Sequence, residues 1–220
     1  MIKAQKKPQI QSTDDMKKIS IVNIPVFFRI AVCLTALFGT IMRIVLSFYI
    51  NPGIEVFLYF TIQSNIMVCA FLLIELFRDK KKKSPHPALQ GGIVLYILIT
   101  GIIYNTMLAS GIQAEGINLI ILTINHTLTP ILFFIDWIIS SRKGLLKWKH
   151  LLLWLIYPLA YLVAGSIEGA VKGQFRYPFL DFIHQKPAYF SLGLTVVISA
   201  FVLVGIFIIL MDKKLSPRIK

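Results

Sequence analysis

Six long apolar runs constrain this chain more than any other feature of its sequence. Each is at least about 20 residues long, the length that an α-helix needs to cross the hydrocarbon core of a bilayer. The runs cover residues 26–49, 56–77, 88–108, 117–139, 151–171 and 189–211. Of the 220 residues, 56% are hydrophobic and 15% are charged, whereas a soluble domain is about 25% charged. The sequence therefore predicts an all-α polytopic membrane protein, a bundle of six transmembrane helices.

Only short polar segments separate the runs, so we expect a single domain over residues 1–220. Asn51-Pro-Gly53 favours a tight turn between the first two runs, and a lysine-rich segment with two prolines follows the second. Residues 1–20 and 212–220 are expected to form cytoplasmic tails. No small-residue cleavage site follows the first apolar run, so we expect that run to remain in the protein and to direct insertion.

Lysine and arginine cluster in alternate connections between the runs. The N-terminal tail and the segment after the second run hold five each, and the segment after the fourth run and the C-terminal tail hold four each. The opposing connections hold none, none and three. Because basic residues favour the cytoplasmic side of a membrane, both termini are expected to be cytoplasmic. This clustering accounts for the net charge of +13, and without a recognisable module we expect no nucleic-acid binding.

Two polar clusters interrupt the apolar runs. The first holds Thr61, Ser64 and Asn65, which share one helix face because they stand at i, i+3 and i+4. The second holds Asn125 and His126. With cytoplasmic termini, Thr61 and His126 fall roughly 8 and 14 Å from the outer ends of their helices, close enough to meet. Since polar side chains are costly in a bilayer unless they face a partner or a cavity, we expect a polar pocket near the outer surface.

Further polar residues fall in the same outer half and keep two interpretations open. Ser64, Asn105 and Thr129 could serve only as hydrogen-bonded contacts between helices. Arg43 belongs to the expected pocket, together with Glu168, but it could also extend to the outer interface or pair with Glu168.

The chemistry that the pocket could support follows from its hydroxyl and its imidazole. A threonine hydroxyl becomes a useful nucleophile only beside a base, and histidine is the usual base. Thr61 and His126 in a lipid-accessible pocket therefore indicate ester hydrolysis on an acyl chain. Asn65 or Arg43 could stabilise a developing oxyanion, and Arg43 could equally hold the carboxylate of a fatty acid. Asp136 lies ten residues after His126, ~15 Å further inward along the helix, so it is expected to anchor the helix end beside the cytoplasm.

No metal or cofactor is expected from the sequence. The four histidines are far apart, and no HExxH spacing, Walker loop or dinucleotide-binding glycine motif is present. Cys33 and Cys69 lie inside apolar runs, where small buried hydrophobic residues are their simplest interpretation.

Three short motifs in order resemble one known family. They are Tyr59-Phe-Thr61, Asn125-His126 with an acidic residue ten positions later at Asp136, and Tyr177-Pro-Phe-Leu-Asp181 before the last run. This pattern resembles the androgen-induced-gene and androgen-dependent TFPI-regulating proteins and their six-span bacterial relatives. The animal members are intramembrane threonine hydrolases that cleave fatty acid esters of hydroxy fatty acids.

The resemblance implies that Thr61 is the nucleophile and His126 the second catalytic residue. It also implies a lipid or fatty acyl substrate and a multi-pass location in a bacterial plasma membrane. The chain departs from the animal proteins after Thr61, where it has Ile-Gln-Ser-Asn in place of a more apolar and acidic segment, and at Pro130, which lies closer to His126. These departures bear on the substrate.

Two alternatives to hydrolysis remain at this point. One is a small transporter that uses Arg43 or Glu168 as a coupling charge, although no inverted repeat is visible. The other is a non-catalytic protein whose polar clusters only pack helices together. The segment from Tyr177 to Asp181 is likewise open: it is either a rigid interfacial loop, or a lid on the pocket in which Asp181 bonds a catalytic group. The sequence indicates no oligomeric state.

Overall fold

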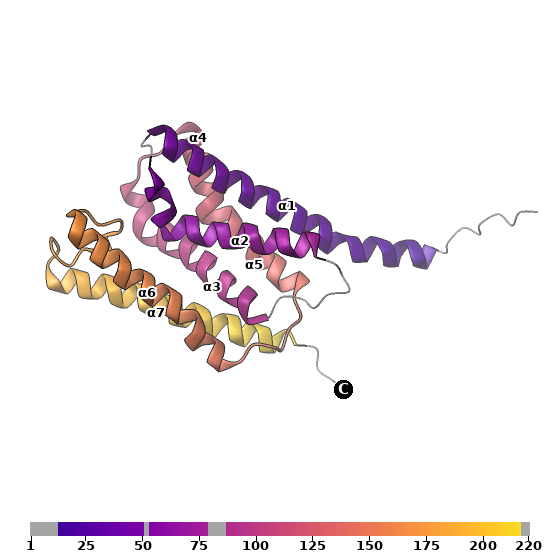
Figure 1. Ribbon diagram of the computed structural model, residues 1–220. Coiled ribbons are helices and arrows are strands. Elements are labelled where there is room, and N and C mark those ends of the chain that lie inside the picture. The colour runs from indigo at the N-terminus through magenta and orange to yellow at the C-terminus, as the bar shows by residue number, and fades with distance from the viewer. Residues whose placement is uncertain (1–12, 51–52, 79–86, 217–220) are drawn as a thin grey trace, which may run out of the picture.

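The computed structural model describes residues 13–50, 53–78 and 87–216, and this part of the chain is helical, with no strand. Six helical stretches in it are long and apolar enough to cross a membrane (Figure 1). They are Val26–Ile50, Phe60–Phe77, Pro87–Gly111, Gly116–Ser140, Trp148–Lys172 and Pro187–Lys214. The predicted all-α bundle of six spans is therefore confirmed.

The spans are built from seven α-helices and five shorter helical turns. In chain order these are α1 (Thr13–Ile50), η1 (Ile54–Leu58), α2 (Phe60–Phe77), α3 (Pro87–Ile103), η2 (Tyr104–Leu108), η3 (Ala109–Gly111), α4 (Gly116–Thr123), η4 (Ile124–Leu128), α5 (Thr129–Ser140), α6 (Trp148–Lys172), η5 (Pro178–Leu180) and α7 (Pro187–Lys214). The third span is α3 continued by η2 and η3, and the fourth is α4, η4 and α5. Both η2 and η4 are π-helical turns.

Five of the six expected runs match the observed spans to within three residues at each end. The second begins four residues later than expected, at Phe60 instead of Val56. A 3-10 turn occupies Ile54–Leu58, and Tyr59 has extended backbone angles of φ −75 and ψ 131, so a new helix starts only after it. This shift makes Thr61 the second residue of α2.

Parts of two predicted connections and of both expected tails fall outside the described residues. These parts are residues 51–52 of the expected turn, the lysine-rich residues 79–86, and residues 1–12 and 217–220 of the expected tails. The described part of the N-terminal tail is helical, since α1 begins at Thr13. With six crossings, the start of α1 and the end of α7 lie at the same end of the bundle (Figure 1).

Helix α3 occupies the centre of the bundle. It packs against α2, α5, α6 and α7, while α1 covers α2 and α5 on one side and α6 pairs with α7 on the other (Figure 1). The core beside it consists of close-packed aliphatic and aromatic side chains such as Leu72, Leu95, Ile97, Phe133 and Ile208. Large apolar side chains also remain exposed on the outside of all six spans, as a lipid-facing surface requires.

A buried ion pair joins three helices near the expected cytoplasmic end. The Arg29 guanidinium of α1 donates through Nε and Nη2 to Asp136 of α5, at 3.1 and 3.2 Å, and through Nη1 to Glu75 of α2 at 3.2 Å. Asp136, expected to anchor the helix end beside the cytoplasm, is instead 0% exposed and paired inside the bundle. A carboxylate held inside the protein needs a compensating charge, and Arg29 supplies it.

Candidate active site

Thr61 and His126 come into direct contact, as their expected depths predicted. The Thr61 hydroxyl lies 3.3 Å from His126 Nε2. Thr61 sits in the first turn of α2, which starts after the extended Tyr59, and His126 lies in the η4 turn within the fourth span. The contact thus joins the second and fourth spans through two residues that are 65 positions apart in the sequence.

Two neighbours fix the imidazole of His126. Its Nδ1 lies 2.9 Å from the backbone carbonyl of Leu122. Because a carbonyl oxygen only accepts hydrogen bonds, Nδ1 carries the proton, and the lone pair of Nε2 is left to accept the Thr61 hydroxyl. The Tyr104 ring stacks on the imidazole with centroids 3.7 Å apart and planes inclined by 19°. A backbone carbonyl therefore orients this histidine in the place that a carboxylate fills in many hydrolases.

The two π-helical turns lie against each other and share a polar contact. From η2, the Asn105 amide donates to the carbonyl of Gly101 at 2.8 Å and to the carbonyl of His126 at 3.1 Å. Gly101 permits the approach, because a Cβ there would lie 2.8 Å from the same His126 oxygen. Single π turns within α-helices are frequent at functional sites, where they leave carbonyls free for such contacts. Asn105, one of the residues considered as a contact between helices, connects the third span to the fourth at the backbone of His126.

Ser64 and Asn65 support Thr61 from behind. Both donate to the Thr61 carbonyl, at 3.0 and 2.8 Å, which is consistent with the single face predicted for them. The Ser64 hydroxyl also contacts Thr100 of α3 at 2.8 Å, and the Asn65 amide donates to the Asn125 carbonyl at 3.3 Å. Ser64 and Asn65 are fully buried and line neither cavity described below.

Asn125 and Thr129 also line neither cavity, and the Thr129 hydroxyl, considered as a contact with a neighbouring helix, has no hydrogen-bond partner in the described part of the chain. The Asn125 amide donates to the carbonyl of Gly39 on α1 at 2.9 Å, and both side chains are buried. Asn125 therefore joins the fourth span to α1. Because the Asn65 amide is engaged with the Thr61 and Asn125 carbonyls, Asn65 is in no position to stabilise an oxyanion.

A cavity of about 420 Å³, called the vestibule below, opens beside the reacting pair. Thr61 and His126 line it, together with Tyr104 and two arginines, Arg43 and Arg176. Arg43 does not pair with Glu168, which was one of the alternatives that the sequence left open, and Glu168, expected in the pocket, does not line the vestibule. Glu168 instead accepts from Arg176 Nε at 3.0 Å and lies 3.0 Å from Lys172 Nζ. Arg43 is half-buried and makes no ion pair with any residue that the structure describes.

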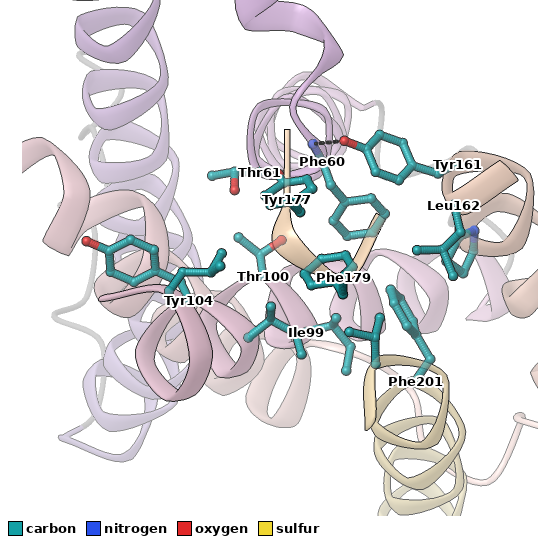
Figure 2. Close-up of a pocket in the computed structure, with 14 residues that line it drawn as sticks. Phe60, Thr61, Ile99, Thr100, Tyr104, Tyr161, Leu162, Tyr177, Phe179 and Phe201 are labelled. Carbon is teal, nitrogen blue, oxygen red and sulfur yellow. Dashed lines mark hydrogen bonds between the residues drawn. The ribbon is translucent and has the colours of Figure 1, made fainter. Parts of the chain in front are cut away.

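A second, narrower cavity also borders Thr61 (Figure 2). This apolar chamber measures about 40 Å³. Its walls come from α2, α3, α6, α7 and the η5 segment, and they include Phe60, Ile99, Leu162, Phe179, Val197 and Phe201. Thr61 lines both cavities, whereas His126 lines only the vestibule.

Tyr177 is a site residue that the sequence analysis missed. It lines both cavities and is 8% exposed. Its side chain lies near the Thr61 and Tyr161 side chains, at the start of α2. Burial raises the pKa of Tyr177, so its hydroxyl keeps its proton at neutral pH. The only signal in the sequence was its place in the motif that ends at Asp181.

Asp181 does not reach the reacting groups. Its carboxylate accepts from the backbone N–H groups of Ile183 at 3.2 Å and His184 at 2.8 Å, and it contacts the His184 ring. Of the two alternatives for this loop, the one in which Asp181 bonds a catalytic group is wrong, because the backbone of the next turn satisfies this carboxylate. The loop nevertheless covers the site, since Tyr177 and Pro178 line the vestibule.

No group of three or more histidine, cysteine, aspartate or glutamate side chains in the described part of the chain is arranged to hold a metal ion. Thr61, His126 and Tyr177 all line the vestibule. Comparison of the chain with family models, with curated proteins and with solved structures finds no match.

Proposed function

We propose that this protein is an intramembrane hydrolase of lipid esters, with Thr61 as its nucleophile and His126 as its general base. The observation that carries the proposal is the 3.3 Å contact between the Thr61 hydroxyl and His126 Nε2. Because His126 Nδ1 donates a hydrogen bond to the Leu122 carbonyl, the lone pair of Nε2 is available to accept the proton of the hydroxyl. A hydroxyl paired with an oriented base is the arrangement that activates serine and threonine nucleophiles. The family resemblance points to the same two residues.

The reaction would proceed in two halves. His126 Nε2 takes the proton of Thr61 Oγ as Oγ bonds to the ester carbonyl carbon, and the carbonyl π electrons move to oxygen. When the tetrahedral species collapses, the bond from carbon to the alcohol oxygen breaks and His126 returns the proton to that oxygen. Water then attacks the acyl-threonine with His126 again as base, and Thr61 Oγ leaves with the proton as the fatty acid forms.

Other residues of the site have roles in this reaction. The Tyr177 hydroxyl, next to Thr61, donates to the oxyanion. Arg43 supplies a positive charge in the vestibule that an anionic part of the substrate can approach. Asn105 and Tyr104 hold the imidazole in place through the contacts described above.

The test is covalent labelling of the full-length protein in membranes by a fluorophosphonate probe, in which an activated hydroxyl displaces fluoride from phosphorus. Wild type and Thr61→Ser should be labelled, whereas Thr61→Ala and His126→Ala should not. Thr123→Ala is the matched control, because that hydroxyl bonds only its own helix at Leu119 and is exposed. Labelling that persists in Thr61→Ala, with an intact melting transition, would contradict the proposal and favour a non-catalytic role.

A further inference from the structure

The two cavities that meet at Thr61 differ in a way that bears on the substrate. The vestibule is wide, about 420 Å³, and contains both arginines, whereas the apolar chamber is only about 40 Å³. Both are bordered by Thr61 and Tyr177, so a carbonyl carbon at the Thr61 hydroxyl would lie at the opening between them. An ester there must place one of its two substituents in each cavity.

The position of His126 decides which substituent lies in which cavity. In the reaction proposed above, Nε2 must deliver a proton to the leaving alcohol oxygen, so that oxygen has to lie on the imidazole side of the carbonyl carbon. His126 borders the vestibule and does not border the chamber. The alcohol part therefore extends into the vestibule, and the acyl part points into the chamber.

The size of the chamber limits the acyl part. One water-sized group fills roughly 10–15 Å³ of a cavity measured in this way, so about 40 Å³ holds about three such groups. The walls leave little room to expand. The Phe60 ring packs against the rings of Tyr157, Tyr161 and Phe201 at centroid distances of 5.6, 5.2 and 5.7 Å.

We propose, on the basis of the function above, that the preferred substrates are esters of a short acyl group, about two to four carbon atoms long, with a larger alcohol that occupies the vestibule. The lipid character of the substrate then lies in its alcohol part. Phe201 and Val197 of α7, which are 5% and 2% exposed, form part of the chamber wall and set the limit on acyl length.

The test is hydrolysis of p-nitrophenyl esters from acetyl to dodecanoyl by the purified full-length protein in lipid nanodiscs, with Thr61→Ala as the blank. For wild type, kcat/KM should be highest from acetyl to butanoyl and should fall by about tenfold or more at octanoyl, since a narrow pocket accommodates extra methylenes poorly. Phe201→Ala and the milder Val197→Ala should move the optimum to longer acyl groups. Phe207→Ala is the matched control, because this residue is on the same helix but outside the chamber.

Different failures have different meanings. A wild-type rate that rises steadily to dodecanoyl overturns the acyl-length inference and leaves hydrolysis intact. The same holds if wild type prefers short esters but folded Val197→Ala keeps an unchanged profile. No hydrolysis of any ester above the Thr61→Ala blank overturns the proposed function and this inference with it.

Discussion

Tyr177 adds a hydrogen-bond donor to the pair formed by Thr61 and His126. Its side chain lies near the Thr61 and Tyr161 side chains, at the start of α2, and burial raises its pKa. A buried, protonated hydroxyl next to the nucleophile can donate to negative charge that develops on a carbonyl oxygen, and such fixed donors act strongly where water is excluded. At the scale of single residues, the proposed site therefore combines two hydroxyls and one imidazole.

Tyr177→Phe should lower kcat by about 10²–10³-fold with little change in KM, because the lost donor acts on the transition state. The measurement is steady-state hydrolysis of a short p-nitrophenyl ester, with Tyr189→Phe as the control, since Tyr189 is 65% exposed. A melting transition recorded for both variants separates a catalytic loss from the loss of about 1 kcal/mol expected for one hydrogen bond. An unchanged kcat in Tyr177→Phe would show that this hydroxyl does not stabilise the oxyanion.

The two π-helical turns are the elements that determine the position of His126. Glycines on two sides let neighbouring helices approach η4 closely: Gly39 on α1 faces Ile124 and Asn125, and Gly101 on α3 faces the His126 carbonyl. Asn105 completes the contact between η2 and η4. The position of the imidazole thus depends on how α1 and α3 pack against one turn of the fourth span.

Gly101→Ala should displace η4, because the new methyl group would lie 2.8 Å from the His126 carbonyl oxygen and 3.2 Å from Pro130 Cβ. A misplacement of roughly 1 Å at a reacting group costs about 10²-fold in rate. Fluorophosphonate labelling should therefore slow strongly in Gly101→Ala while the helical content by circular dichroism stays constant. In Gly53→Ala a Cβ meets open space, so this control should label at the wild-type rate. Equal labelling rates in both variants would show that η4 tolerates the displacement.

In the whole molecule, the contact between Thr61 and His126 and the buried ion-pair cluster lie toward opposite ends of the bundle. Thr61 is in the first turn of α2, whereas the cluster of Arg29, Glu75 and Asp136 joins α1, α2 and α5 near the ends of α2 and α5. Removing one member of a buried ion pair leaves an uncompensated charge, which is much more costly than losing an exposed pair. The two ends should therefore respond separately to substitution.

Asp136→Asn should lower the free energy of unfolding by about 3–5 kcal/mol, yet leave fluorophosphonate labelling per folded molecule unchanged. Unfolding in a detergent titration measures the first quantity, and labelling normalised to folded protein measures the second. Glu55→Gln is the matched control: Glu55 pairs with Lys172 at an exposed position, where solvent screens the interaction, so its loss should have little effect. Loss of labelling in folded Asp136→Asn would instead connect this carboxylate to the reaction.

Hydropathy along the chain was sufficient to predict the six spans and to place Thr61 and His126 at similar depths. A backbone in lipid must satisfy its own hydrogen bonds, so a long apolar run forms a helix. The number of residues from the helix end then gives the depth of each side chain. Hydropathy did not predict where α2 starts. The residues of the 3-10 turn before Tyr59 are as apolar as the helix that follows, so hydropathy does not distinguish the two conformations.

The tertiary structure decided which polar groups at a given depth actually meet. Depth does not specify how each helix is rotated about its axis or which neighbour it faces. For that reason the pairing of Glu168 with Arg176 instead of Arg43, the buried partner of Asp136, and the approach of Tyr177 to Thr61 all depended on packing. The sequence by itself determined a six-span helical protein with two polar clusters at similar depths. Packing of α3 against its neighbours determined that these clusters form one site.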